Sequence, residues 1–138
     1  MVALFFTLSS GVSNAVEVRE TLPFVEGRYA TVENCELAKT FDKAGGDHSK
    51  AVSPWHLTAK GFDDLWESSC KFHVVFVRGD EATAHAICVF GGETYPKLYY
   101  FWKTESPADH PDIQVFTDEN DRSDNNMGED YIWCPQAK

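Results

Sequence analysis

The fold of this chain is decided by residues 70–90, which read CKFHVVFVRGDEATAHAICVF. Residues 71–77 and 82–90 are rich in β-branched and aromatic side chains, as strands are. Between them, Arg78-Gly79-Asp80-Glu81 supplies the residue types that tight turns use. This pattern predicts a β-hairpin. We interpret the tripeptide Arg78-Gly79-Asp80, which integrins read on hairpin tips, as turn chemistry.

A disulfide between Cys70 and Cys88 would fix the register of the hairpin, because bridged cysteines must face each other across the two strands. A two-residue turn at Gly79-Asp80 would conflict with this register, since it shifts the pairing by one residue. The cysteine register places large apolar residues opposite small ones on one face and two histidines opposite each other on the other face. The predicted pairs are Phe72–Ala86, Val74–Ala84, Phe76–Ala82 and His73–His85.

The four cysteines are widely spaced and form no Cys-x-x-Cys pair. In an exported chain, this number and spacing indicate two disulfides, for which three connectivities are possible. The hairpin register favours Cys70–Cys88. Elimination then pairs Cys35 with Cys134, which would tie the first strand to the last.

The rest of the chain alternates short strand-like segments with turn residues. Residues 36–39 could form one helical turn, and residues 62–67 are ambiguous between a strand and a helical turn. The strand candidates beyond the hairpin are residues 27–32, 55–59, 98–102, 112–116 and 131–134. We therefore predict an all-β fold: a small antiparallel barrel or sandwich of about seven or eight short strands, with two disulfides.

Residues 1–15 form a separate segment of the sequence. They carry no charge, and the apolar run at 2–8 is too short to span a bilayer. Ser13-Asn14-Ala15 places small side chains where a signal peptidase reads. We predict a signal peptide at 1–15, a single disulfide-stapled β domain at 16–138, and a periplasmic or secreted location. The alternative for residues 1–15 is a buried first strand or helix.

The charge of the chain narrows the possible partners. The 138 residues include 12 Lys+Arg and 22 Asp+Glu, which gives a formal net charge of -10. A phosphate field would repel such a chain, so this balance argues against general nucleic-acid binding and docking on anionic membranes. A protein partner, a cation or a small ligand remains compatible with it.

The cysteines and their neighbours carry a resemblance. The residues concerned are Gly27-Arg28-Tyr29, Cys35, Glu67-Ser68-Ser69-Cys70, Cys88 and Tyr131-Ile132-Trp133-Cys134. With this spacing the chain resembles a class of small exported bacterial four-cysteine all-β proteins. The resemblance spans roughly the mature chain and implies a signal peptide and an all-β body. It brings no catalytic residues with it.

Two groups of residues could bind a metal. If His73 faces His85, their imidazoles could chelate Zn²⁺ or Cu²⁺ with a third ligand such as His56; the alternative is a surface pair. The acidic residues 118–130 could bind Ca²⁺, but Ser123 stands where an EF-hand loop needs glycine. We therefore expect a solvated loop there.

The aromatic residues 98–102 form the last candidate site. Tyr99 and Phe101 share one face of this strand and could form a ligand or partner surface, although a strand buried on both sides explains the pattern equally well. The sequence contains no G-x-S-x-G, H-E-x-x-H or phosphate-loop motif, and we expect neither an enzyme nor a cofactor.

We therefore expect an exported β-barrel that binds a small ligand or a protein partner, one version being an inhibitor of a hydrolase such as a basic lysozyme. The alternative is a periplasmic metal-binding protein that uses His73 and His85.

Overall fold

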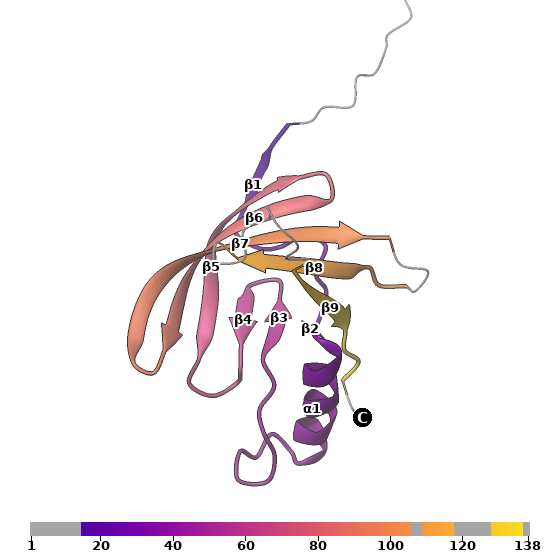
Figure 1. Ribbon diagram of the computed structural model, residues 1–138, viewed down its shortest axis with the longest axis vertical. Helices are drawn as coiled ribbons and strands as arrows, with labels where there is room; N and C mark the ends of the chain where they lie inside the picture. The colour runs from indigo at the N-terminus through magenta and orange to yellow at the C-terminus, as the bar shows by residue number, and fades with distance from the viewer. Residues whose placement is uncertain (1–14, 106–108, 118–127, 137–138) are drawn as a thin grey trace, which may run out of the picture.

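The computed structural model describes residues 15–105, 109–117 and 128–136. Within these ranges eight strands form a closed antiparallel barrel, and a further strand is added on its outside (Figure 1). One helix follows the first barrel strand. The elements are β1 (Glu17–Arg19), β2 (Tyr29–Ala30), α1 (Val32–Lys43), β3 (His56–Thr58), β4 (Gly61–Asp63), β5 (Ser69–Arg78), β6 (Glu81–Phe90), β7 (Glu93–Thr104), β8 (Asp112–Thr117) and β9 (Glu129–Trp133).

The strand order shows how the barrel closes. Around the ring the order is β5-β4-β3-β2-β9-β8-β7-β6, and pairing of β6 with β5 completes it. On the other edge of β5, β4 pairs with residues 69–71 and β1 with residues 75–77. The predicted all-β fold is confirmed, and of the two predicted architectures the barrel is correct.

The interior of the barrel is packed around Phe62 of β4, which is 2% exposed. The centroid of its ring lies 4.5 Å from that of Tyr99, 6.0 Å from that of Phe72 and 6.1 Å from that of Phe101. The inward-facing residues of β6 are mostly alanines, whose small side chains leave room for these rings. The core is therefore aromatic.

Both predicted disulfides are present, Cys70–Cys88 and Cys35–Cys134. The first joins facing residues of β5 and β6. The second joins α1 to the residue that follows β9, and it closes a loop with a sequence separation of 99 residues. The bridge therefore connects the two ends of the barrel sequence where β2 and β9 pair.

The β5–β6 register agrees with the prediction as far as Phe72 and departs from it at His73. A β-bulge there inserts one extra residue into β5, so that Val74 faces His85. The predicted pairs Val74–Ala84, Phe76–Ala82 and His73–His85 are therefore wrong.

The turn explains this bulge. Arg78 faces Glu81, so residues 79–80 form a two-residue turn, whose register is one residue out of step with the cysteine bridge. One extra residue in β5 reconciles the two. Beyond the bulge the faces of the strand are exchanged: Val75 is buried, whereas Phe76 is 38% exposed.

The helix is longer than the one turn predicted at residues 36–39. It begins after Thr31, whose hydroxyl accepts a hydrogen bond from the Asn34 amide, and it buries only Cys35, Ala38 and Phe41. These three residues form a narrow stripe, in which only Phe41 has a large side chain. The broad apolar face by which periodicity identifies a helix is absent from this segment.

Two predictions fall outside the described residues: all but Ala15 of the signal peptide, and all but Gly128, Glu129 and Asp130 of the acidic segment 118–130. Within the described ranges, no helix has the length and apolar character needed to cross a membrane. The two disulfides are consistent with an extracellular or otherwise oxidising compartment.

Candidate functional site

One end of the barrel is plugged by the segment between β1 and β2. Leu22 and Val25 are buried in the main core, with exposures of 1% and 4%. The amide of Leu22 donates a hydrogen bond of 2.8 Å to the carbonyl oxygen of Ala59, in the turn between β3 and β4. These apolar side chains close this end of the barrel. Only the opposite end can therefore be open to solvent.

At the opposite end lies a cavity of about 620 Å³. Its wall combines α1 and the loop after it, β4 and the β4–β5 loop, the middle of β7, and the adjoining ends of β6, β8 and β9. The lining residues are Asn34, Leu37, Val52, Ser53, Trp55, Phe62, Asp64, Ser68, Phe90, Lys97, Tyr99, Val115, Thr117, Glu129 and Tyr131. The barrel is therefore a cup with its opening beside the helix.

Five of the lining side chains that the structure describes are aromatic: Trp55, Phe62, Phe90, Tyr99 and Tyr131. Trp55 stacks on Phe62 with 5.6 Å between ring centroids and 5° between planes, and Phe90 lies 5.5 Å from Trp55. Tyr131 meets Phe62 edge-on at 5.8 Å. These rings form a continuous wall from the floor of the cup to its rim.

The two tyrosines add polar groups to this wall. Burial raises the pKa of Tyr131 far above its ordinary value, and the nearby Glu129 carboxylate raises it further. The side chain of Trp55 acts on this pKa in the opposite direction, as a smaller effect. The hydroxyl of Tyr99 lies 3.2 Å from Sγ of Cys70. Tyr131 therefore stays neutral at ordinary pH.

Three charged residues belong to the described lining: Asp64, Glu129 and Lys97. Asp64 lies in the β4–β5 loop, where its Oδ1 accepts hydrogen bonds from the amides of Trp66 and Ser68 at 2.9 and 3.0 Å. The ammonium group of Lys97 lies 5.5 Å from the centroid of the Tyr99 ring. The lining thus places cationic and anionic groups next to aromatic faces.

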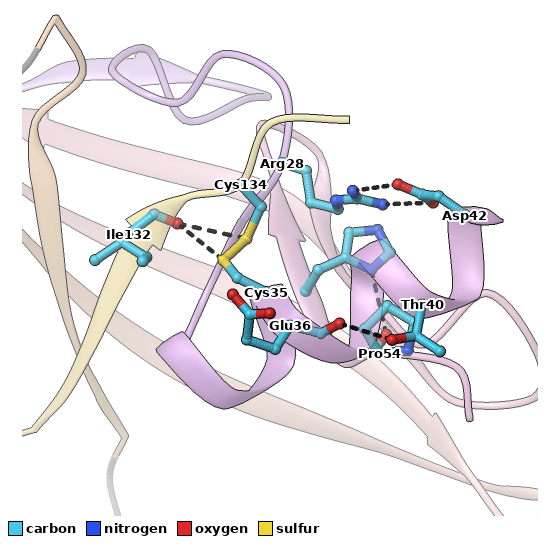
Figure 2. A network of polar contacts seen from close by, with 9 residues as sticks. Arg28, Cys35, Glu36, Thr40, Asp42, Pro54, Ile132 and Cys134 are labelled. Carbon is cyan, nitrogen blue, oxygen red and sulfur yellow. Dashed lines mark hydrogen bonds and ion pairs between the residues drawn. A yellow bond between two sulfur atoms is a disulfide. The ribbon is translucent and has the colours of Figure 1, made fainter. Parts of the chain in front are cut away.

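The helix is held beside the opening at both of its ends (Figure 2). Near its beginning, Cys35 is bridged to Cys134. Near its end, Asp42 receives two hydrogen bonds from the Arg28 guanidinium, at 3.1 and 2.7 Å. The side chain of Arg28 is only 8% exposed, so this ion pair is shielded from solvent. Asn34, just before the first anchor, and Leu37, between the two anchors, line the cavity.

His56 lies in this buried contact rather than with His73 and His85. It is 4% exposed, and its Nδ1 donates a hydrogen bond of 3.3 Å to the carbonyl oxygen of Pro54. Burial lowers its pKa, and the positive charge of Arg28 acts in the same direction. The structure therefore does not place His56 as a third ligand for the predicted metal pair.

His73 and His85 line one hollow of about 390 Å³ on the outer face of β5, β6 and β7. Because of the bulge, the two histidines are not directly opposite each other, as was predicted. The His85 ring packs edge-on against the exposed Phe76 ring, with 5.6 Å between centroids. Among the described residues, no group of three His, Cys, Asp or Glu side chains is arranged to hold a metal ion.

The aromatic strand β7 is divided between core and cavity. Tyr99 lines the cavity, whereas Phe101 is 0% exposed and belongs to the core. A surface role is therefore wrong for Phe101, because its face of β7 points into the lumen. Sequence reasoning missed Trp55, Phe62 and Tyr131. All three are aromatic residues within or next to predicted strands, but only closure of the barrel brings them together.

Comparison with known proteins adds no relative: no family model matches the chain, and neither curated proteins nor solved structures give a match.

Proposed function

We propose that this protein binds a small organic ligand in the open end of its barrel. The observation that carries the proposal is the wall of five aromatic rings around a cavity of about 620 Å³. Small-molecule sites are typically concave, mostly apolar and about 300–1,000 Å³ in volume, with a few fixed polar groups. The cavity therefore favours a small ligand over the protein partner or hydrolase that the sequence also allowed.

The structure also suggests how affinity would arise. A ligand that lies against Trp55 and Phe90 in the cavity would bury apolar area on rings that already pack on one another. Little ordering is required of the protein, because the disulfide and the Arg28–Asp42 ion pair already hold the helix in place. We further propose that the chain acts outside the cytoplasm after removal of residues 1–15, as its two disulfides support.

The test is calorimetric titration of the disulfide-bonded chain with a panel of planar aromatic compounds. Phe90→Ala removes one ring from the wall and is expected to weaken binding about tenfold. Trp102→Ala is the matched control, because Trp102 is 49% exposed on β7 and does not line the cavity. Equal affinity in the two variants would contradict a site in the cup.

A second candidate function is metal binding at the outer hollow, which brings His73 and His85 together. Each exposed imidazole could coordinate Zn²⁺ or Cu²⁺ through one ring nitrogen, with water completing the coordination. Titration with Zn²⁺ alone is expected to show a single site that is lost in His85→Ala and kept in His110→Ala. Unchanged Zn²⁺ affinity in His85→Ala would reject it.

A further inference from the structure

The charges around the cavity favour one sign of ligand. Two carboxylates, of Asp64 and Glu129, and one ammonium group, of Lys97, belong to the described lining. The chain as a whole carries a formal net charge of -10. A field of this sign raises the local concentration of cations and lowers that of anions. An anionic ligand would have to approach the rim against both the local and the overall charge.

Lys97 places a positive charge beside an aromatic ring of the cavity wall. Its ammonium group lies 5.5 Å from the centroid of the Tyr99 ring, within the range of a cation–π interaction. Lys97 faces Ala86 in the β6–β7 ladder, so its backbone is fixed, but its side chain is long and can turn outward. The chain's own cation thus occupies a place at the aromatic wall that a ligand cation could take over.

Glu129 supplies the opposite charge at the same wall. It begins β9 and lines the cavity together with Tyr131, whose pKa its negative charge raises. A carboxylate therefore lies beside the aromatic wall. Trp55 and Phe90, which are only partly buried, present further aromatic surface in the same cavity. Aromatic faces beside a carboxylate suit an organic ammonium group, which carries its charge next to apolar surface.

We propose that the ligand is an organic cation, an ammonium group joined to a planar apolar body, with the body among the five rings and the ammonium group near Glu129. This inference rests on the proposed function and specifies the ligand class for the same cavity. It assigns Glu129 as the residue that selects charge and Lys97 as a competitor for the same aromatic surface.

The experiment compares three indoles of similar size that differ in charge: tryptamine, the neutral tryptophol and the anionic indole-3-propionate. Each is titrated calorimetrically into the disulfide-bonded chain. We expect tryptamine to bind about tenfold more tightly than tryptophol, and indole-3-propionate to bind most weakly. Equal affinities for the three compounds, or a preference for indole-3-propionate, would overturn the proposal that the ligand is a cation. The proposal that the cavity binds a small ligand would stand. If none of the three binds, both proposals fail.

Two variants test the assigned residues. Glu129→Gln keeps the shape of the side chain but removes the charge, and it is expected to cost about tenfold in tryptamine affinity with little effect on tryptophol. Lys97→Met keeps the length and apolar stem and is expected to strengthen tryptamine binding severalfold. Glu81→Gln, next to the β5–β6 turn and outside the lining, is the control. An equal loss for tryptamine and tryptophol in Glu129→Gln would mean that Glu129 supports shape and not charge, and would overturn its assignment.

Discussion

Among the described glycines, Gly61 is the one at which an added Cβ would come closest to another atom. Its φ is +145°, and a Cβ there would stand 2.1 Å from the carbonyl oxygen of Cys70 on the neighbouring strand. Neither backbone can yield, because residues 61–63 and 69–71 form one ladder. We expect Gly61→Ala to cost more than about 4 kcal/mol of unfolding free energy, measured by urea denaturation.

Gly79 provides the control for this prediction. It also has a positive φ, +57°, but a Cβ there would meet nothing within 4 Å. Gly79→Ala should therefore lower the unfolding free energy by only about 1 kcal/mol, the cost of placing alanine in a left-handed backbone conformation. A similar loss in the two variants would show that close approach at Gly61 is not what matters.

His56 should make stability depend on pH. Burial and Arg28 lower its pKa in the folded state, so the unfolded chain binds this proton more readily than the folded one. Its contribution is present above the unfolded pKa of about 6.5 and is lost as the pH falls towards the folded pKa. Thermal unfolding between about pH 7.5 and about pH 5 should therefore show falling stability, with a slope of at most about 1.4 kcal/mol per pH unit from this group.

The variant His56→Gln should remove that part of the slope, because glutamine does not titrate. If the slope of His56→Gln matched that of the unsubstituted chain, the buried imidazole would not be its source.

At the residue scale the sequence identified part of the site. Tyr99 could be placed with Phe101 on one face of a strand by alternation alone. Alternation could not say that this face points into a lumen, since that depends on the neighbours β6 and β8. Trp55 and Tyr131 come from segments far apart in the chain, and no local pattern joins them.

At the scale of elements, β5 shows why a correct local pattern can give a wrong register. The cysteine bridge and the two-residue turn each indicate a definite pairing, and the two pairings differ by one residue. The cysteine register, extended along the whole hairpin, is therefore wrong beyond Phe72. With His73 inserted as a bulge, β5 fits both the cysteine bridge at one end and the two-residue turn at the other. Regular alternation of inward and outward residues cannot predict such an insertion.

The bulge leads to a prediction about the whole strand. Without His73, the buried residues Phe72, Val75 and Val77 would alternate regularly with the more exposed Val74 and Phe76. Deletion of His73 should therefore yield a folded protein whose unfolding free energy lies within about 1.5 kcal/mol of the original, judged by urea denaturation and near-UV circular dichroism.

A deletion elsewhere in β5 has the opposite consequence. Deleting Val75 removes a fully buried residue and puts Phe76 in the inward position beside β6. The protein should then lose more than about 4 kcal/mol or fail to fold. If deletion of His73 proved equally damaging, the bulge would be a requirement of barrel curvature and not only a correction of register.

At the scale of the whole molecule, the four cysteines predicted the closure of the barrel better than any strand pattern did. Their pairing depends only on which positions the topology brings together, and the hairpin left one partner for each remaining cysteine. The cup could not be foreseen in the same way. Its plug, Leu22 and Val25, and its opening beside α1 depend on how loops pack against the two ends of the barrel.

The long disulfide should connect stability to binding. In the chain-entropy treatment, a loop of 99 residues contributes about 4.7 kcal/mol, and the 18-residue loop of Cys70–Cys88 about 3 kcal/mol. Replacing Cys35 and Cys134 together by alanine should therefore destabilise the protein more than the same change at Cys70 and Cys88. Urea denaturation measures both losses.

Binding should separate the two disulfides more sharply than stability does. Without Cys35–Cys134, α1 retains the Arg28–Asp42 ion pair near its end but loses the covalent anchor near its beginning, where Asn34 and Leu37 line the cavity. Ligand affinity should then fall about tenfold, since the helix must be ordered at the expense of binding energy. Loss of Cys70–Cys88 leaves the helix anchored and should change affinity much less. Equal affinity losses in the two double variants, measured where both are folded, would mean that the helix does not form part of the binding site.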